Sequence, residues 1–125
     1  MLEALQAMSS VILDPFLLLL IFATTIIGVI IGVLPGIGAT TGAALLLPFT
    51  LTMTPVHAIT VLATIYVSAT FAGSITAILI NTPGTSAAAA TTFDGFPLAQ
   101  RGEAGRALGV AVVSSTVGGI FSVIV

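Results

Sequence analysis

Two short segments hold the residues whose types and spacing best suit ligand binding. Residues 34–42 read LPGIGATTG and residues 81–86 read NTPGTS, so each places Pro-Gly before small and hydroxyl-bearing side chains. Proline and glycine release backbone groups from helical hydrogen bonds, and hydroxyls add donors and acceptors. Our candidates for substrate or ion binding are Pro35, Gly36, Gly38, Thr40, Thr41, Ser74, Asn81, Thr82, Pro83, Gly84, Thr85 and Ser86.

Two kinds of ligand chemistry are open to these segments. Helices that begin just after each Pro-Gly would direct free N–H groups and a positive dipole end toward an anionic substrate. The carbonyls that end the preceding helices, together with Thr and Ser oxygens, would equally suit a small cation. Asn81 is the only asparagine and combines a donor with an acceptor, so it is the first candidate.

Close helix packing is the alternative explanation for many small residues. Several glycines recur at intervals that let helix backbones approach in membranes, namely Gly28, Gly32 and Gly36, Gly38 and Gly42, and Gly105 and Gly109. For any single Thr or Gly we favour packing. For residues 35–36 and 81–84 we favour ligand binding, because packing alone does not require a proline in mid-span.

The composition is that of a membrane protein. The 125 residues are 58% hydrophobic and 5% charged, and no charged residue occurs from Pro15 through Phe93, whereas soluble domains carry about 25% charge. With no Cys and one His, the sequence excludes disulfides, a thiolate nucleophile and a Cys or His metal site. Two arginines are too few to form the basic surface that binds nucleic acid. Paired carboxylates, a Ser-His-Asp set and a phosphate loop are missing, so we expect no enzyme and no cofactor.

Hydropathy predicts an all-α fold, a single transmembrane domain of polytopic helices with discontinuous (Pro-Gly-broken or re-entrant) segments. We expect spanning helices at 16–34, 56–80 and 107–125, the first two starting after Asp14-Pro15 and Thr54-Pro55. Between them we expect a re-entrant segment at 35–53, whose helix stops at Pro48, a broken segment at 81–93 and a cytoplasmic loop at 94–106. Helix 56–80 is long enough to tilt or to break near Gly73. Residues 1–13 predict an interfacial amphipathic helix, with an extra turn docked on neighbouring helices as the alternative.

The few polar residues outside the two segments receive simpler interpretations. We expect His57 to form a structural hydrogen bond, with a proton relay as the alternative, and Tyr66 to serve packing. Two arginines in residues 94–106 favour a cytoplasmic side for that loop. The acidic N-terminal region then lies on the opposite side, so an odd number of crossings separates Asp14 from Asp94. In one such arrangement the second broken segment completes a third crossing.

Three motifs in this order resemble a known family. LPGIG at 34–38, SITAILINTPGTSA at 74–87 and DGFPLAQRGEAGRALG at 94–109 resemble the large membrane subunit of the bacterial tripartite tricarboxylate transporters. The resemblance implies a secondary-active, multi-pass permease of the bacterial inner membrane, which imports tricarboxylates or related carboxylates and is coupled to Na⁺ or H⁺. It implies two partners, a small membrane subunit and a periplasmic solute-binding protein. Members of the family are much longer, which implies an N-terminal fragment here.

A function of a different class also fits the sequence. The glycine-rich faces would suit a small helical membrane subunit that binds partner helices and has no solute path of its own.

Overall fold

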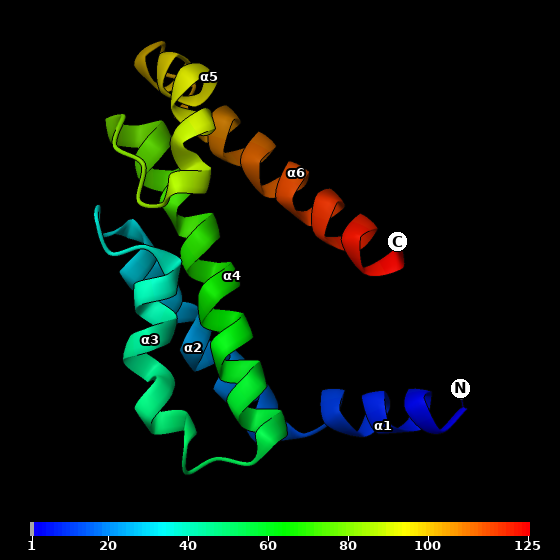
Figure 1. Cartoon of the computed structure of the whole chain (residues 1–125). Coiled ribbons are helices and arrows are strands. Elements are labelled where there is room, and N and C mark those ends of the chain that lie inside the picture. The colour runs from blue at the N-terminus through cyan, green and yellow to red at the C-terminus, as the bar shows by residue number, and fades with distance from the viewer. Residues whose placement is uncertain (1) are drawn as a thin grey trace.

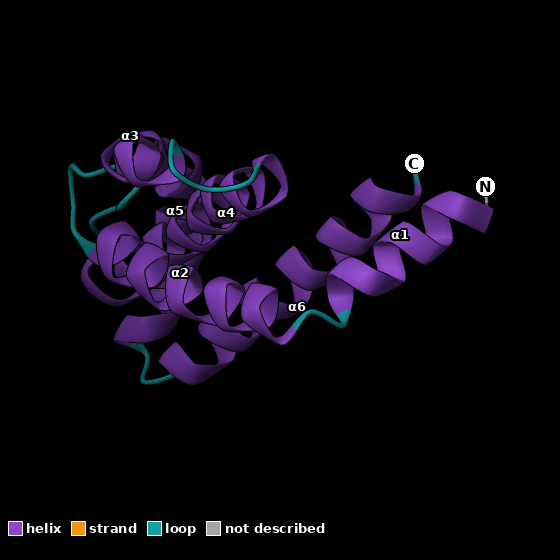
Figure 2. Ribbon diagram, turned by 90° about the horizontal axis from the view of Figure 1, so that it is seen from below, coloured by secondary structure: helices purple, strands orange, loops and turns teal. Residues whose placement is uncertain are grey.

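A computed structural model describes residues 2–125, and these fold into helices without a strand in that range. In chain order the elements are α1 (Leu2–Ile12), α2 (Pro15–Val33), α3 (Ala39–Thr50), α4 (Pro55–Ile80), the short 3₁₀ helix η1 (Ser86–Ala88), α5 (Ala89–Gln100) and α6 (Ala104–Ile124) (Figure 1). Short loops join them (Figure 2). The predicted all-α class is confirmed.

The two central helices begin as their sequences predict. Asp14 caps α2, and its Oδ1 accepts a hydrogen bond of 3.0 Å from the amide of Phe16. Thr54 caps α4 in the same way, with 3.5 Å between its Oγ1 and the amide of His57. Each cap is followed by proline, whose missing N–H costs nothing in a first turn.

Helices α2 and α4 lie side by side and run in the same direction (Figure 1). Their beginnings meet at Asp14 and His57, with 3.9 Å between Oδ2 and Nε2, and the His57 ring also lies edge-on to Phe16. Further along, Gly32 of α2 packs so closely on Ala69 of α4 that a Cβ there would collide with the α4 backbone. The buried core along this contact is formed by Leu17, Val61, Ile65, Ala69 and Ala72. Helix α4 is continuous, so the alternative of a break near Gly73 is wrong.

Three helices, α2, α4 and α6, are long and apolar enough to cross a membrane. They differ in how much protein surrounds them. In the apolar window of α4, 44% of the residues are buried inside the protein, against 22% in α2 and 6% in α6. Helix α4 is therefore the centre of the bundle, and α6 is almost entirely exposed.

Helix α3 follows α2 in the chain and runs back antiparallel to α2 and α4, on the outer side of the bundle and packed mainly on α4 (Figure 1). It continues through Pro48 to Thr50, so the prediction that Pro48 stops it is wrong. Proline removes one hydrogen bond from a helix, and the packing of α3 on α4 maintains the turn around it. Twelve residues span about 18 Å, less than the roughly 30 Å hydrocarbon core. The chain thus runs back through the first broken segment, whereas one of the arrangements considered from the sequence gave a crossing to the second.

The expected loop at 94–106 is helical over most of its length. Helix α5 extends through Pro97 to Gln100, and α6 already begins at Ala104, so only residues 101–103 form the connection. Gly95 is buried where α5 crosses α4, and a Cβ on it would lie 2.7 Å from Cγ1 of Ile78. Tertiary packing against α4 therefore stabilises a helix that the polar sequence alone does not predict.

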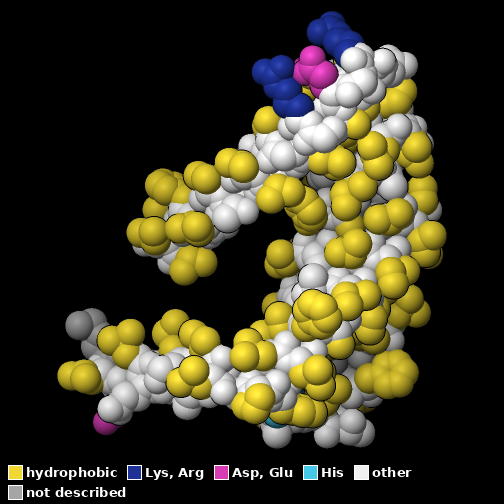
Figure 3. Space-filling view, turned by 180° about the vertical axis from the view of Figure 1, so that it is seen from behind, with side chains coloured by type: hydrophobic (Ala, Val, Ile, Leu, Met, Phe, Trp, Pro, Cys, Tyr) yellow, Lys and Arg dark blue, Asp and Glu magenta, His cyan; other side chains and the backbone are white. Residues whose placement is uncertain are grey.

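Helices α1 and α6 project from the same side of the bundle and give the molecule an open C shape (Figures 1 and 3). No residue of α1 is buried, which contradicts the alternative that it docks on its neighbours. Its interfacial position stays a prediction. The arginines gather at the end formed by α5 and the start of α6, while Glu3, on α1, lies at the opposite end (Figure 3).

Only some of the regularly spaced glycines lie at contacts between helices. Gly28 and Gly32 contact α4, and Gly42 of α3 contacts Ile31 of α2. A Cβ on Gly36 would meet no atom within 4 Å, and the same holds for both glycines at the start of α6, Gly105 and Gly109. Gly36 is instead required by its turn, because its φ of 91° is unfavourable for other residues.

Candidate functional site

The second broken segment folds back onto α4 and does not face lipid. Asn81 ends α4 in the left-handed conformation, with a φ of 56°, which asparagine tolerates better than most residues. The amides of Asn81 and Thr82 both donate to the carbonyl of Thr76, the second at 3.3 Å. The amide of Gly84 donates to the carbonyl of Gly73 at 3.3 Å. These amides therefore have partners within the protein, as membrane depth demands.

Glycines from three segments make this fold-back possible. Gly84 is buried, and a Cβ on it would collide with the carbonyl oxygen of Gly32 on α2 and lie 2.9 Å from Cα of Gly73 on α4. A Cβ on Gly73 would lie 2.8 Å from both the amide and the hydroxyl of Thr85. Gly84 thus has a packing role, whereas the sequence favoured ligand binding.

The two broken segments meet at one small cavity of about 110 Å³. The start of α3 forms one side, η1 with the residue before it forms the opposite side, and α4 closes a third side. The lining residues are Gly38, Ala39 and Thr40, then Tyr66 and Thr70, then Thr85, Ser86 and Ala87. Segments more than forty residues apart in the chain therefore build one site.

The hydroxyl groups at the cavity differ from most other hydroxyls of the protein. Typical helical ones donate to a carbonyl one turn earlier, as Thr24 does to Leu20 at 2.7 Å and Ser68 to Thr64 at 2.6 Å. Thr70 also donates backward, to the carbonyl of Tyr66 at 2.7 Å, which leaves its oxygen as an acceptor. Within residues 2–125, the remaining cavity hydroxyls, Thr40, Tyr66, Thr85 and Ser86, have no such partner.

Thr85 has a buried hydroxyl oxygen that packs against Gly73 of α4. Its Oγ1 is buried and has no hydrogen-bond partner within the described chain. A buried polar group without a partner costs about 1–3 kcal/mol. Such a group usually marks an ordered water, an ion or a ligand.

The start of α3 adds backbone donors to the same cavity. Gly38 is its N-cap and has no side chain to accept from the first-turn amides, so these N–H groups keep their positive polarity. The cavity lining contains no charged residue. Its electrostatics therefore come from helix dipole and hydroxyls, an arrangement that favours an anion with accessible oxygens.

The structure places the sequence-predicted residues in three groups. Gly38, Thr40, Thr85 and Ser86 line the cavity, whereas Ser74 lines two neighbouring cavities. The others lie outside the cavity lining: Pro35, Gly36 and Thr41 near the start of α3, and Asn81, Thr82, Pro83 and Gly84 between α4 and η1. Asn81 acts here through its backbone, and its side chain is exposed.

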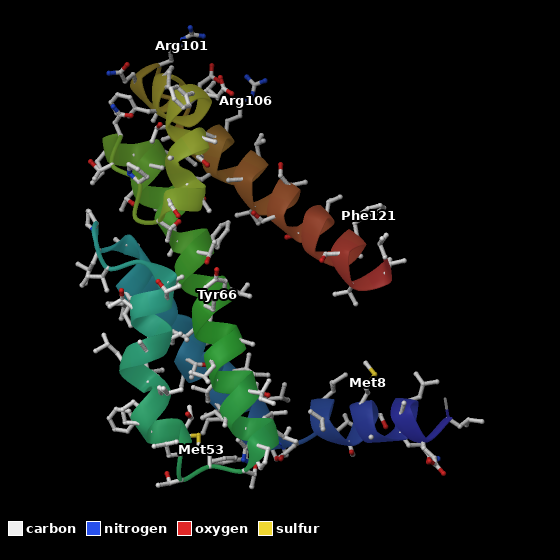
Figure 4. The ribbon with its side chains drawn as sticks, viewed as in Figure 1. Met8, Met53, Tyr66, Arg101, Arg106 and Phe121 are labelled. Atoms are coloured by element: carbon white, nitrogen blue, oxygen red, sulfur yellow. The ribbon has the colours of Figure 1, made fainter. Side chains whose placement is uncertain are left out.

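Sequence reasoning missed Tyr66 and Thr70, which it assigned to packing or left unmentioned. Tyr66 is 49% exposed and lies midway along α4, away from Arg101 and Arg106 (Figure 4). The two residues are one turn apart, so they share a face of α4. This spacing could have indicated that Tyr66 and Thr70 lie together, but no sequence pattern predicts which face of α4 meets the broken segments.

The fold and this site define a class of protein. Apolar helices of spanning length, interrupted by broken segments that meet at an uncharged hydroxyl-lined cavity, are typical of secondary membrane transporters.

The comparisons with known proteins identify the family. The chain belongs to the tripartite tricarboxylate transporter TctA family, whose model matches residues 18–125. A relative from Agrobacterium vitis, described as an uncharacterized 52.8 kDa protein in the TAR-I ttuC' 3' region, is 46% identical over 103 residues. The match covers 82% of this chain and 20% of that protein, so the chain spans about a fifth of the relative's length. No solved structure matches the chain.

Proposed function

We propose that the chain forms part of a secondary-active permease that imports tricarboxylates or related carboxylates across the bacterial inner membrane. Membership of the TctA family supports transport of this class. The observation that carries the site assignment is the cavity in which both broken segments meet, lined by the exposed residues Thr40, Tyr66 and Ser86. A transport role, and no enzymatic one, is proposed.

The cavity suits one carboxylate group. Hydroxyls of Thr40, Tyr66 and Ser86 would donate to its oxygens, and the first-turn amides of α3 would add dipolar stabilisation. The nearest arginines belong to the α5–α6 end (Figure 4). The protein itself therefore offers the anion dipoles and hydroxyls, and no charged side chain of the lining.

A coupling ion, Na⁺ or H⁺, belongs to the same proposal. Thr70 donates its proton to the Tyr66 carbonyl, so its oxygen offers only lone pairs to the cavity. Lone pairs of this kind are ligands for Na⁺. We propose that a cation on the Thr70 side offsets the negative charge of the bound carboxylate.

The proposed partners follow from the tripartite architecture in the family's name. They are a small membrane subunit and a periplasmic solute-binding protein that delivers the carboxylate. The bare surface of α6 leaves ample area for contact with other membrane helices.

A second candidate function, a membrane interaction subunit without a solute path, is favoured by the same helix. Gly105 and Gly109 have open space around them, as expected for a surface that accepts a partner helix.

Uptake by the full-length protein carrying Thr40→Val or Ser86→Ala tests the transport proposal. Each change removes a hydroxyl at nearly constant volume, and we expect initial citrate uptake to fall about tenfold, the loss of one hydrogen bond to a charged group. Thr60→Val is the matched control, because the Thr60 hydroxyl donates to Val56 within its own helix.

Normal uptake in both cavity variants, at normal expression, would contradict the site assignment. Absence of carboxylate uptake by the unmodified protein with its partners would instead favour the interaction subunit.

A further inference from the structure

The small cavity is too small for a whole tricarboxylate. Its volume is about 110 Å³, whereas sites for small organic ligands usually measure about 300–1,000 Å³. A water molecule occupies roughly 30 Å³ in the liquid. The cavity therefore suits a compact carboxylate of the size of malonate, and the rest of a larger substrate must lie elsewhere.

A second cavity adjoins the first across the same face of α4. It measures about 330 Å³ and shares Tyr66, Thr70 and Ala87 with the small cavity. Its other walls include Phe71 of α4 and Ser115 of α6. Tyr66 and Thr70 thus stand at the junction of two cavities, one uncharged and rich in hydroxyls, the other larger and more apolar.

The second cavity also contains hydroxyls that the fold does not use. Ser74 of α4 and Ser115 of α6 line it. In the described part of the chain neither hydroxyl is engaged with another residue, although the adjacent Ser114 donates to Val110 at 2.7 Å. Both serines also line a third, larger cavity between α4, α5 and α6, so the second cavity is reachable from that groove.

We propose that the two cavities form one elongated site, with Tyr66 and Thr70 where the two cavities join. One carboxylate of the substrate occupies the small cavity, and the remainder extends past Tyr66 to Ser74 and Ser115. These residues then determine substrate size: compact carboxylates need only the small cavity, while tricarboxylates require both. This inference rests on the proposed transport function.

The chemistry of the lining fits a polyanion with a carbon backbone. Phe71 and Val67 offer apolar contact to methylene groups, and Ser74 and Ser115 donate to a distal carboxylate. Neither cavity is lined by a charged residue. Size and hydroxyl contacts therefore provide the discrimination within these two cavities, whereas Arg106 and Asp94 line the adjoining third cavity.

The test compares citrate with malonate, a dicarboxylate with a single methylene group, in the full-length transporter with its partners. Ser115→Leu extends a larger side chain into the second cavity from α6, at a position that is exposed and outside the buried part of that helix. We expect the ratio of citrate to malonate uptake to fall about tenfold, because the distal part of citrate loses its space and a charge-assisted hydrogen bond. The ratio is taken within one preparation, so differences in expression cancel.

Thr116→Leu is the matched control, since Thr116 neighbours Ser115, lines none of these cavities and donates to Val112 at 2.8 Å. Ser74→Val repeats the test from the α4 side should Ser115→Leu fail to assemble. An unchanged ratio, or an equal loss of both substrates, overturns the elongated site. Absence of uptake of either compound by the unmodified transporter overturns the proposed function instead.

Discussion

The amide of Gly84 donates a hydrogen bond to the carbonyl of Gly73, with 3.3 Å between nitrogen and oxygen. This contact pins the second broken segment to the middle of α4, eleven residues back along the chain. From there, η1 starts opposite the first turn of α3, and the small cavity lies between them. The close approach requires that Gly73 and Gly84 lack a Cβ. A Cβ on Gly84 would collide with the Gly32 carbonyl and lie 2.9 Å from Cα of Gly73, and one on Gly73 would lie 2.8 Å from the amide of Thr85.

Gly84→Ala should therefore destabilise the protein without removing any ligand group. A Cβ at this position collides with the Gly32 carbonyl, and such overpacking costs about 1–3 kcal/mol. The melting temperature of the purified full-length protein should fall. Gly119→Ala is the control, because nothing lies within 4 Å of a Cβ on Gly119. Equal melting temperatures for the two variants would mean that the three-glycine contact does not form.

Substitutions of Asn81 distinguish a role of its backbone conformation from a role of its side chain in ligand binding. Asn81→Gly should retain both stability and citrate uptake, because glycine adopts the left-handed conformation that ends α4. Asn81→Val should lose about 1–3 kcal/mol of stability, because a β-branched residue is strained there. Melting temperature and uptake are measured together. A stable Asn81→Gly protein without uptake would show that the Asn81 side chain binds the ligand.

The two ends of the bundle should be accessible from opposite sides of the membrane. Ser10 lies at the α1 end, next to the start of α2, and Gln100 lies at the end of α5, beyond the far end of α4 (Figure 1). A membrane-impermeant thiol reagent should label Ser10→Cys from the periplasmic side only and Gln100→Cys from the cytoplasmic side only. The protein without an added cysteine gives the background. Labelling of both positions from one side would contradict the proposed orientation.

Much of the fold could be predicted because its causes are local. The caps at Asp14 and Thr54, each followed by proline, fix where α2 and α4 begin. Long apolar runs then continue each helix until a turn residue ends it. Helices that are interrupted by proline were predicted poorly, since Pro48 and Pro97 both lie inside helices. In each case the helix packs on α4, and packing outweighs the loss of one hydrogen bond.

The sequence predicted only some of the residues that line the cavity, because contacts between distant segments decide which side chains reach it. The sequence pointed to Thr40, Thr85 and Ser86 because they follow Pro-Gly, and these residues line one cavity. It also pointed to Asn81 and Gly84, which lie outside the cavity lining and have roles in the turn and in packing. Composition does not distinguish a hydroxyl or glycine used for packing from one left free, because the difference lies in contacts with distant residues.

By itself the sequence determined that this is a helical membrane protein with two interrupted segments and no charge through its central region, since these properties depend on composition and local spacing. Only the tertiary structure decided that the two segments share one cavity and that Tyr66 and Thr70 line it. It also decided that Gly32, Gly73 and Gly84 come into contact. The physical reason is that parallel packing of α2 and α4 sets which faces and which backbone atoms meet, and these contacts join residues far apart in the chain.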